Sequence, residues 1–190
     1  MLQNTIKYYE NVTNLALKNL SEGKSFQFRK FMKNPSLLAA NESHLLKLNN
    51  SKAARDMIKK YQQDMQNMYK IAVKDYNAVL AKIKATNDPI LKQKLLNDYA
   101  NEGIKGFTAK NGARWNIETY SNMYTTHINN ELVRMRVRED AKSNLFQVSD
   151  HGTICELCIP YEGRILTGQE LDESTLFHPR CRHYITEVTA

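Results

Sequence analysis

The last forty residues of the chain hold the side chains best suited to chemistry. All three cysteines lie there, together with three of the five histidines. Cys155 and Cys158 form a Cys-x2-Cys pair, and Cys181 lies between His178 and His183. Thiolates and imidazoles bind Zn²⁺, which takes four ligands in structural sites, usually two from each of two turns. The spacing therefore predicts a structural zinc site.

The expected ligands are Cys155, Cys158, Cys181 and His183, with His178 as the alternative fourth ligand. His151 is a weaker candidate. About forty residues with few large apolar side chains bury too little surface to hold a fold, and metal binding can supply on the order of 10 kcal/mol. Two alternatives stay open. The thiols can be reduced, buried and metal-free while the histidines cap turns, or the Cys pair can be a thioredoxin-type redox pair, although no βαβ pattern surrounds it.

Apolar residues at steps of three and four predict a helical framework before this segment. The longest helix is expected from about 52 to 84, following Ser51 as its cap, and would extend about 50 Å. Its predicted apolar stripe consists of Ala54, Ile58, Tyr61, Met65, Met68, Ala72, Tyr76, Val79 and Ile83. Further helices are expected at 2–22, within 37–48, at 90–101 and from 117 onward, with a turn-rich connector at 106–115.

After Leu145 the pattern changes to alternation, which is typical of short strands. Strands are expected around 146–148, 164–167 and 184–188. The predicted fold class is therefore mainly α: a helical domain over 1–145 and a small α+β, zinc-ribbon-like Cys/His module of short strands over 146–190.

Charge is unevenly distributed along the chain. Residues 1–100 contain seventeen Lys and Arg against eight Asp and Glu, whereas residues 151–190 contain three against six. Any contact with DNA or another polyanion is therefore expected in the helical part, although lysines also simply coat solvent-facing helices. No apolar run is long enough to span a membrane, the first residues do not resemble a secretory signal, and three cysteines suit a metal in a reducing cytosol better than disulfides.

The chain contains, in this order, the motifs Gly112-x-Arg114-Trp115-x-Ile117-x-x-Tyr120-x-x-Met123, Val148-Ser149-x-His151, Cys155-x-x-Cys158, Tyr161-Glu162-Gly163-Arg164 and His178-Pro179-Arg180-Cys181-Arg182-His183. With this set of motifs the chain resembles the phage minor capsid, or phage head morphogenesis, family. The resemblance covers roughly residues 103–185. Related head proteins can carry Cys at the position of His183.

The resemblance implies a minor component of a tailed-phage or prophage head. Such a protein acts beside the portal during assembly or at DNA packaging and ejection, with portal and capsid proteins as partners, possible oligomerisation and no membrane. It would be found in the virion, and in the host cytoplasm during assembly. Family members are often longer, and some carry a toxin or enzyme domain; with seven residues after His183, no toxin cargo is expected.

Two other function classes compete with this structural role. The basic helices can make the protein a sequence-independent DNA-binding module. A small metal-dependent nuclease would need His151 as general base and Asp150 as a metal ligand. Since no activated nucleophile with an orienting partner emerges from the spacing, the protein is expected not to be an enzyme.

Overall fold

The computed structural model describes residues 2–26, 42, 44–103, 105–109 and 112–189. The chain divides into two compact units, Met1–Asn41 with Lys59–Asn122, and Glu42–Ile58 with Met123–Ala190. The predicted boundary between domains at 145 and 146 stays a prediction.

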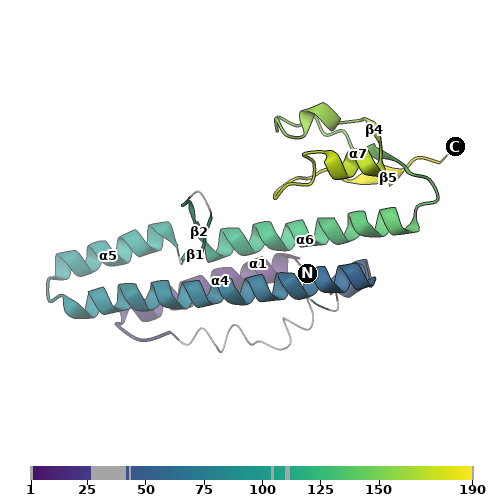
Figure 1. Cartoon of the computed structure of the whole chain (residues 1–190). Coiled ribbons are helices and arrows are strands. Elements are labelled where there is room, and N and C mark those ends of the chain that lie inside the picture. Colours follow the sequence, from purple (N-terminus) through teal and green to yellow (C-terminus); the bar gives the residue numbers. More distant parts are fainter. Residues whose placement is uncertain (1, 27–41, 43, 104, 110–111, 190) are drawn as a thin grey trace. The chain divides into compact units, whose positions relative to one another are not determined.

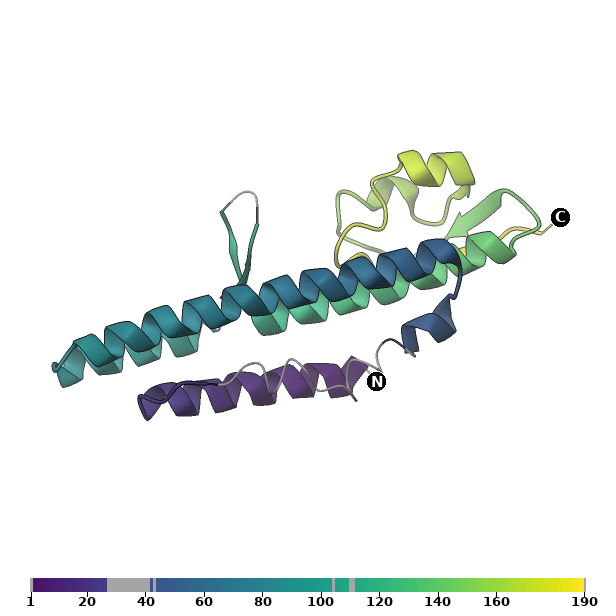
Figure 2. The ribbon, with the colours of Figure 1, turned by 60° about the horizontal axis from the view of Figure 1, so that its bottom comes forward.

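The first unit is built from long amphipathic helices (Figure 1). They are α1 (Leu2–Ser21), most of α4 (Lys52–Ala85) and α5 (Pro89–Glu102). The helix α1 ends where Gly23 takes a positive φ of 66°, a conformation that costs glycine little. Asp88 caps α5 by accepting hydrogen bonds from the backbone N–H groups of Ile90 and Leu91. Helices α4 and α5 are joined by a short turn and form a helical hairpin (Figures 1 and 2).

The apolar stripe predicted for α4 forms its buried face. Of the nine predicted positions, all but Val79 are buried, and Tyr69 and Leu80 are buried beside them. Tyr76 is fully buried and donates a hydrogen bond from its hydroxyl to the carbonyl of Lys24, at 2.8 Å. Burial raises the pKa of Tyr76 to about 12, because a charged phenolate would lose its hydration there.

A β-hairpin replaces the connector that the sequence predicted at 106–115. Its strands are β1 (Lys105–Thr108) and β2 (Arg114–Asn116), paired antiparallel with Phe107 opposite Trp115. Figure 2 shows it standing out from the helices of this unit. Phe107 stacks on Tyr120 of the helix that follows, with ring centroids 4.6 Å apart. This contact between neighbouring segments stabilises the short strands.

The second unit begins with a helical segment at 44–48 and the first residues of α4, and continues with α6 (Ile117–Asp140) from Met123 onward. Asn49 is buried and donates from Nδ2 to Oε2 of Glu139, at 2.9 Å. Its Oδ1 accepts the backbone N–H of Ser51 at the start of α4. The helix predicted within 37–48 falls partly outside the described residues.

The remainder of this unit is a three-stranded antiparallel sheet with short helices. The strand order is β4 (Ile165–Thr167), β3 (Leu145–Val148) and β5 (Ile185–Glu187). A 3-10 turn, η1 (Ile159–Tyr161), precedes β4, and α7 (Gly168–Glu173) follows it with a Thr167–Glu170 capping box. The core of the sheet is small and includes two of the cysteines: Phe146, Val148, Cys158, Leu166, Leu171, Leu176, Cys181 and Ile185.

The predicted fold class is confirmed, because the chain is mainly helical with a small C-terminal strand region around a Cys/His cluster. None of the described helices is both long and apolar enough to cross a membrane.

Candidate metal centre

Two similar turns carry most of the Cys and His donors. In the first, the backbone N–H of Cys158 donates to the carbonyl of Cys155 at 2.9 Å. In the second, the N–H of Cys181 donates to the carbonyl of His178, also at 2.9 Å. Each turn therefore presents two potential ligands three positions apart, an arrangement common to structural zinc sites.

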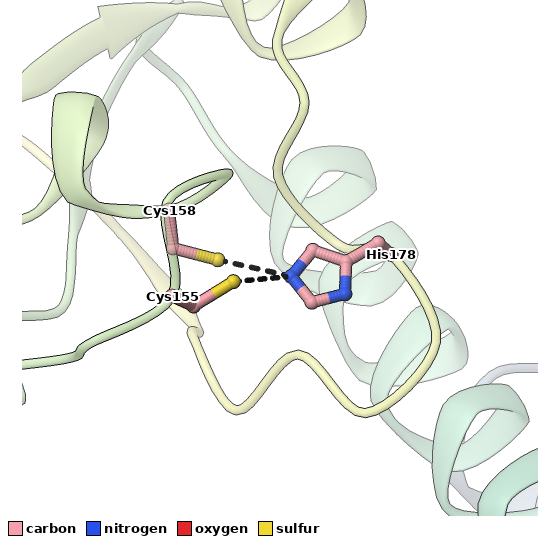
Figure 3. A group of neighbouring side chains, drawn as sticks. All are labelled: Cys155, Cys158 and His178. Carbon is pink, nitrogen blue, oxygen red and sulfur yellow. Dashed lines mark hydrogen bonds between the residues drawn. The ribbon is translucent and has the colours of Figure 1, made fainter.

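His178 points its ring at the first turn. Its Nε2 atom lies 3.3 Å from the sulfur of Cys155 and 3.1 Å from that of Cys158 (Figure 3). The other ring nitrogen, Nδ1, lies 2.9 Å from the carbonyl oxygen of Pro179. Because a carbonyl only accepts, Nδ1 carries the hydrogen, and the lone pair of Nε2 faces the two sulfurs. A second hydrogen bond of this kind orients most metal-binding histidines.

Cys181 and His183 continue the cluster on the other side of Cys158. The sulfurs of Cys158 and Cys181 are 3.8 Å apart, and Nδ1 of His183 lies 3.5 Å from the sulfur of Cys181. The five donors thus form two groups that share Cys158, Cys155–Cys158–His178 and Cys158–Cys181–His183, with ligand atoms within 4.8 Å of one another in each.

These separations fit the donor set of a tetrahedral zinc ion. Zn–S bonds of about 2.3 Å and Zn–N bonds of about 2.0 Å place two sulfurs about 3.8 Å apart, and a sulfur and a nitrogen about 3.5 Å apart. The measured Cys158–Cys181 distance equals the first value, and the sulfur–nitrogen distances of 3.1, 3.3 and 3.5 Å lie near the second. The Cys/His cluster can therefore bind a metal.

Burial and the closeness of the sulfurs disfavour free thiolates in the cluster. Cys158 and Cys181 are buried, and Cys155 is half-buried. Burial, followed by the neighbouring sulfurs of Cys155 and Cys181, raises the pKa of Cys158 to about 12. Thiolates this close repel one another in a poorly hydrated site, and a divalent cation offsets that repulsion.

Two residues of helix α6 contact the second turn and the residues beside it. The guanidinium of Arg134 is buried, lies over the Phe177 ring, and donates from Nη1 to the carbonyl of His183 at 3.3 Å. Asn130 donates from Nδ2 to the carbonyl of Cys181 at 3.4 Å. Desolvation lowers the pKa of Arg134 to about 10, so it stays charged at neutral pH beside the sulfurs.

The backbone of the second turn is strained. Phe177 and Arg180 have φ values of 63° and 72°, and they are the non-glycine residues with positive φ in the described part of the chain. Such conformations cost about 1–3 kcal/mol each and persist where the surroundings impose them. They occur on either side of His178, so the backbone that carries this candidate ligand has a costly conformation.

Glu162 hydrogen-bonds the ring of His183 on the side away from the cysteines. Its Oε1 lies 3.0 Å from Nε2 of His183, and its carboxylate accepts the backbone N–H groups of His151 and Thr153 at 2.9 to 3.1 Å. Burial disfavours its charge, but the hydrogen bonds from His183 and from these two N–H groups outweigh that effect and hold the pKa of Glu162 below its usual value.

The structure brings all five predicted donors into one cluster. His151 lies outside both groups: its Nε2 contacts the hydroxyl of Ser149 at 2.9 Å, while Asp150 accepts the N–H of Gly152. Sequence reasoning missed Glu162 and Arg134 as supporting residues. Glu162 belongs to the Tyr-Glu-Gly-Arg motif, a signal that was available, whereas nothing in the sequence marks Arg134 among the arginines of its helix.

The chain matches a known protein family. The family model for phage minor capsid protein 2 matches residues 3–188, nearly the whole chain. Searches of curated proteins and of solved structures found no significant match. The match includes both the helices and the Cys/His cluster, and the family implies a structural role in a phage capsid, localisation in the virion, and contact with other virion proteins. The chain therefore belongs to the phage minor capsid protein 2 family.

Proposed function

We propose that the protein acts in head morphogenesis of a tailed phage or prophage, as a structural component near the portal. The observation that supports this proposal is the family match over residues 3–188. Because the match includes both the helical part and the Cys/His cluster, the proposed role belongs to the whole chain. Its partners would be portal and capsid proteins. It would be present in the host cytoplasm during assembly and in finished virions afterwards.

Co-expression with the portal and major capsid proteins of the same phage tests this role. The chain should co-purify with the portal and migrate with it in size-exclusion chromatography with light scattering, which also gives its oligomeric state. A phage lacking the gene should yield fewer filled heads, and a plasmid-borne copy should restore them. A chain that migrates alone, with normal heads in the deletion phage, would contradict the proposal.

We further propose that the Cys/His cluster binds a structural Zn²⁺. Three thiols and imidazole nitrogens are soft and borderline donors that suit zinc better than Mg²⁺ or Ca²⁺, which prefer oxygen. Metal analysis of the chain purified without chelator should give about one zinc per chain. If the purified protein contains no metal and its C-terminal part nevertheless stays folded, the proposal of a structural zinc is refuted.

Direct contact with packaged DNA is the second candidate function, and one specific observation favours it. The basic residues of α4 are all exposed: Lys52, Arg55, Lys59, Lys60, Lys70, Lys74, Lys82 and Lys84. The same helix carries only three acidic residues, Asp56, Asp64 and Asp75. Side chains of this kind bind phosphates without reading sequence, and their affinity falls with salt.

Fluorescence anisotropy of a labelled duplex across a salt series tests this function. Each phosphate contact contributes about −0.9 to the slope of log K against log salt. Replacing Lys59, Lys60, Lys70 and Lys74 with Glu should flatten the slope, whereas Lys142→Glu and Arg182→Glu, outside α4, should leave it nearly unchanged. A flat salt response of the wild-type chain would exclude DNA binding of this kind.

The nuclease alternative has weaker support. Among the described His, Cys, Asp and Glu side chains, neither group able to hold a metal includes Asp150 or His151. Plasmid that stays intact with the protein and Mg²⁺ or Mn²⁺ would end that alternative, and nicking that disappears in His151→Ala would revive it.

A further inference from the structure

The two turns of the cluster are closed by the same backbone hydrogen bond, although Arg180 gives the second a positive φ, and this similarity distinguishes the two histidines. Cys155 and Cys158 stand at the ends of one turn, and His178 and Cys181 at the ends of the other; each turn is closed by one hydrogen bond of 2.9 Å between its end residues. Structural zinc sites commonly take two ligands from each of two such turns. His183 lies beyond the second turn.

The contacts of the two imidazoles also differ. Nε2 of His178 lies within 3.3 Å of the sulfurs of both Cys155 and Cys158. Nδ1 of His183 lies 3.5 Å from the sulfur of Cys181, in the group that lacks Cys155, whereas His178 belongs to the group that lacks Cys181. An ion bound by all three sulfurs must stay close to the Cys155–Cys158 pair, and the ring that faces this pair is that of His178.

The second ring nitrogen of His183 bonds Glu162, while Nδ1 faces Cys181. The carboxylate of Glu162 only accepts, so Nε2 of His183 donates to it across 3.0 Å. The same carboxylate binds the backbone N–H groups of His151 and Thr153. His183 is 3% exposed. The Glu162 carboxylate therefore connects the residue just before β5 with the loop at His151 and Thr153 that leads into Cys155. A carboxylate in this position orients a histidine whether or not its ring binds the metal, so the contact of His178 with two sulfurs distinguishes the two rings.

We infer that the metal is held by Cys155, Cys158, His178 and Cys181, and that His183 is a positioning residue paired with Glu162. This assignment rests on the proposed zinc. It replaces the sequence-based expectation of His183 as the fourth ligand with the alternative, His178. The site is then three sulfurs and one Nε2 nitrogen.

Cobalt substitution tests the assignment with a gain of signal. Co²⁺ added to the chelator-treated full chain should give the visible bands of a tetrahedral site with three sulfurs and one nitrogen. His178→Cys should convert them to the four-sulfur pattern, with stronger thiolate-to-cobalt charge transfer. The matched variant His183→Cys should keep the three-sulfur pattern, and His183→Gln should keep it with affinity reduced about 10- to 100-fold, the usual effect of an outer-shell change.

Long-range ¹H–¹⁵N correlation spectra of the zinc-loaded wild-type chain give an answer that needs no variant to fold. Zinc should shift Nε2 of His178 while its Nδ1 stays protonated, and Nδ1 of His183 should not show a coordination shift. A four-sulfur spectrum from His183→Cys, or a zinc-bound Nδ1 of His183, would overturn the assignment and leave the zinc proposal intact. Wild-type chain that binds neither Co²⁺ nor Zn²⁺ would overturn both.

Discussion

The guanidinium carbon of Arg134 lies 4.1 Å from the centre of the Phe177 ring. Arg134 is 4% exposed, forms an ion pair with Glu131, and hydrogen-bonds the carbonyl of His183. A single buried cation of α6 therefore fixes both sides of the turn that carries His178 and Cys181. The ring face, the carboxylate and the carbonyl offset part of its desolvation, which still lowers the pKa of Arg134.

Replacement of Arg134 should destabilise the zinc-loaded second unit. Arg134→Met retains an unbranched aliphatic chain but removes the cation–π contact and the charged hydrogen bonds. The expected cost is about 2 kcal/mol. The urea midpoint measures this loss. Arg136→Met is the control, because Arg136 pairs with Asp140 on the surface and should change stability by less than about 0.5 kcal/mol. Equal effects of the two variants would show that Arg134 is not a structural anchor.

Removal of one shared ligand should affect the C-terminal module selectively. Cys158 belongs to both donor groups, so Cys158→Ser should abolish tight metal binding and loosen residues 146–190. The long helix α4 should survive because it has its own buried apolar stripe, most of which belongs to the first unit. Hydrogen exchange should rise across 146–190 while helical circular dichroism stays nearly constant. Helical signal that falls in parallel with zinc content would disprove this independence.

Two buried tyrosines should respond oppositely to loss of the hydroxyl. Tyr76 donates to the carbonyl of Lys24, and Tyr76→Phe should cost about 1 kcal/mol. The hydroxyl of Tyr99 is buried without a hydrogen-bond partner among the described residues, and burial raises its pKa well above the usual value. Tyr99→Phe should therefore be neutral or stabilising by up to about 1 kcal/mol, since it removes an unsatisfied polar group. Urea denaturation of both variants checks the contrast, which equal losses would contradict.

Two glycines with positive φ separate backbone strain from crowding. Gly23 has a φ of 66°, and no atom of the described residues lies within 4 Å of where its Cβ would be, whereas Gly103 has a φ of 70° and would place its Cβ 2.9 Å from the Cβ of Asn116. Gly23→Ala should cost about 1 kcal/mol from the conformation alone. Gly103→Ala should cost clearly more, because it also displaces Asn116, whose Oδ1 caps α6 by accepting the N–H of Thr119. Thermal midpoints of the two variants measure the difference, and similar midpoints would show that Asn116 moves freely.

The helices could be predicted because each has several turns of the same period. The stripe from Ala54 to Ile83 repeats often enough to identify α4 and its buried face within about two residues of its ends. The hairpin of β1 and β2 was missed because strands of three or four residues carry too little alternation. Its stability depends on partners such as Tyr120, which the sequence does not place beside Phe107.

The donor cluster could be predicted from residue types, but the relative roles of its two histidines could not. His178 and His183 flank Cys181 at similar separations, and spacing alone does not tell which ring faces Cys155. That depends on the positive φ values at Phe177 and Arg180, and on the partner that Glu162 provides for His183. Strained backbone and long-range hydrogen bonds have no local sequence pattern.

The strand order β4-β3-β5 has a consequence for the rate of folding. The central strand β3 is synthesised first, and the pairing of Val148 with Ile185 must close a long loop before it contributes any stability. Metal bound early by the two turns would bring the ends of that loop together. The conformational search that remains before β5 pairs with β3 would then be shorter. Zinc would then act as a folding nucleus that accelerates the last strand, as well as a stabiliser of the finished sheet.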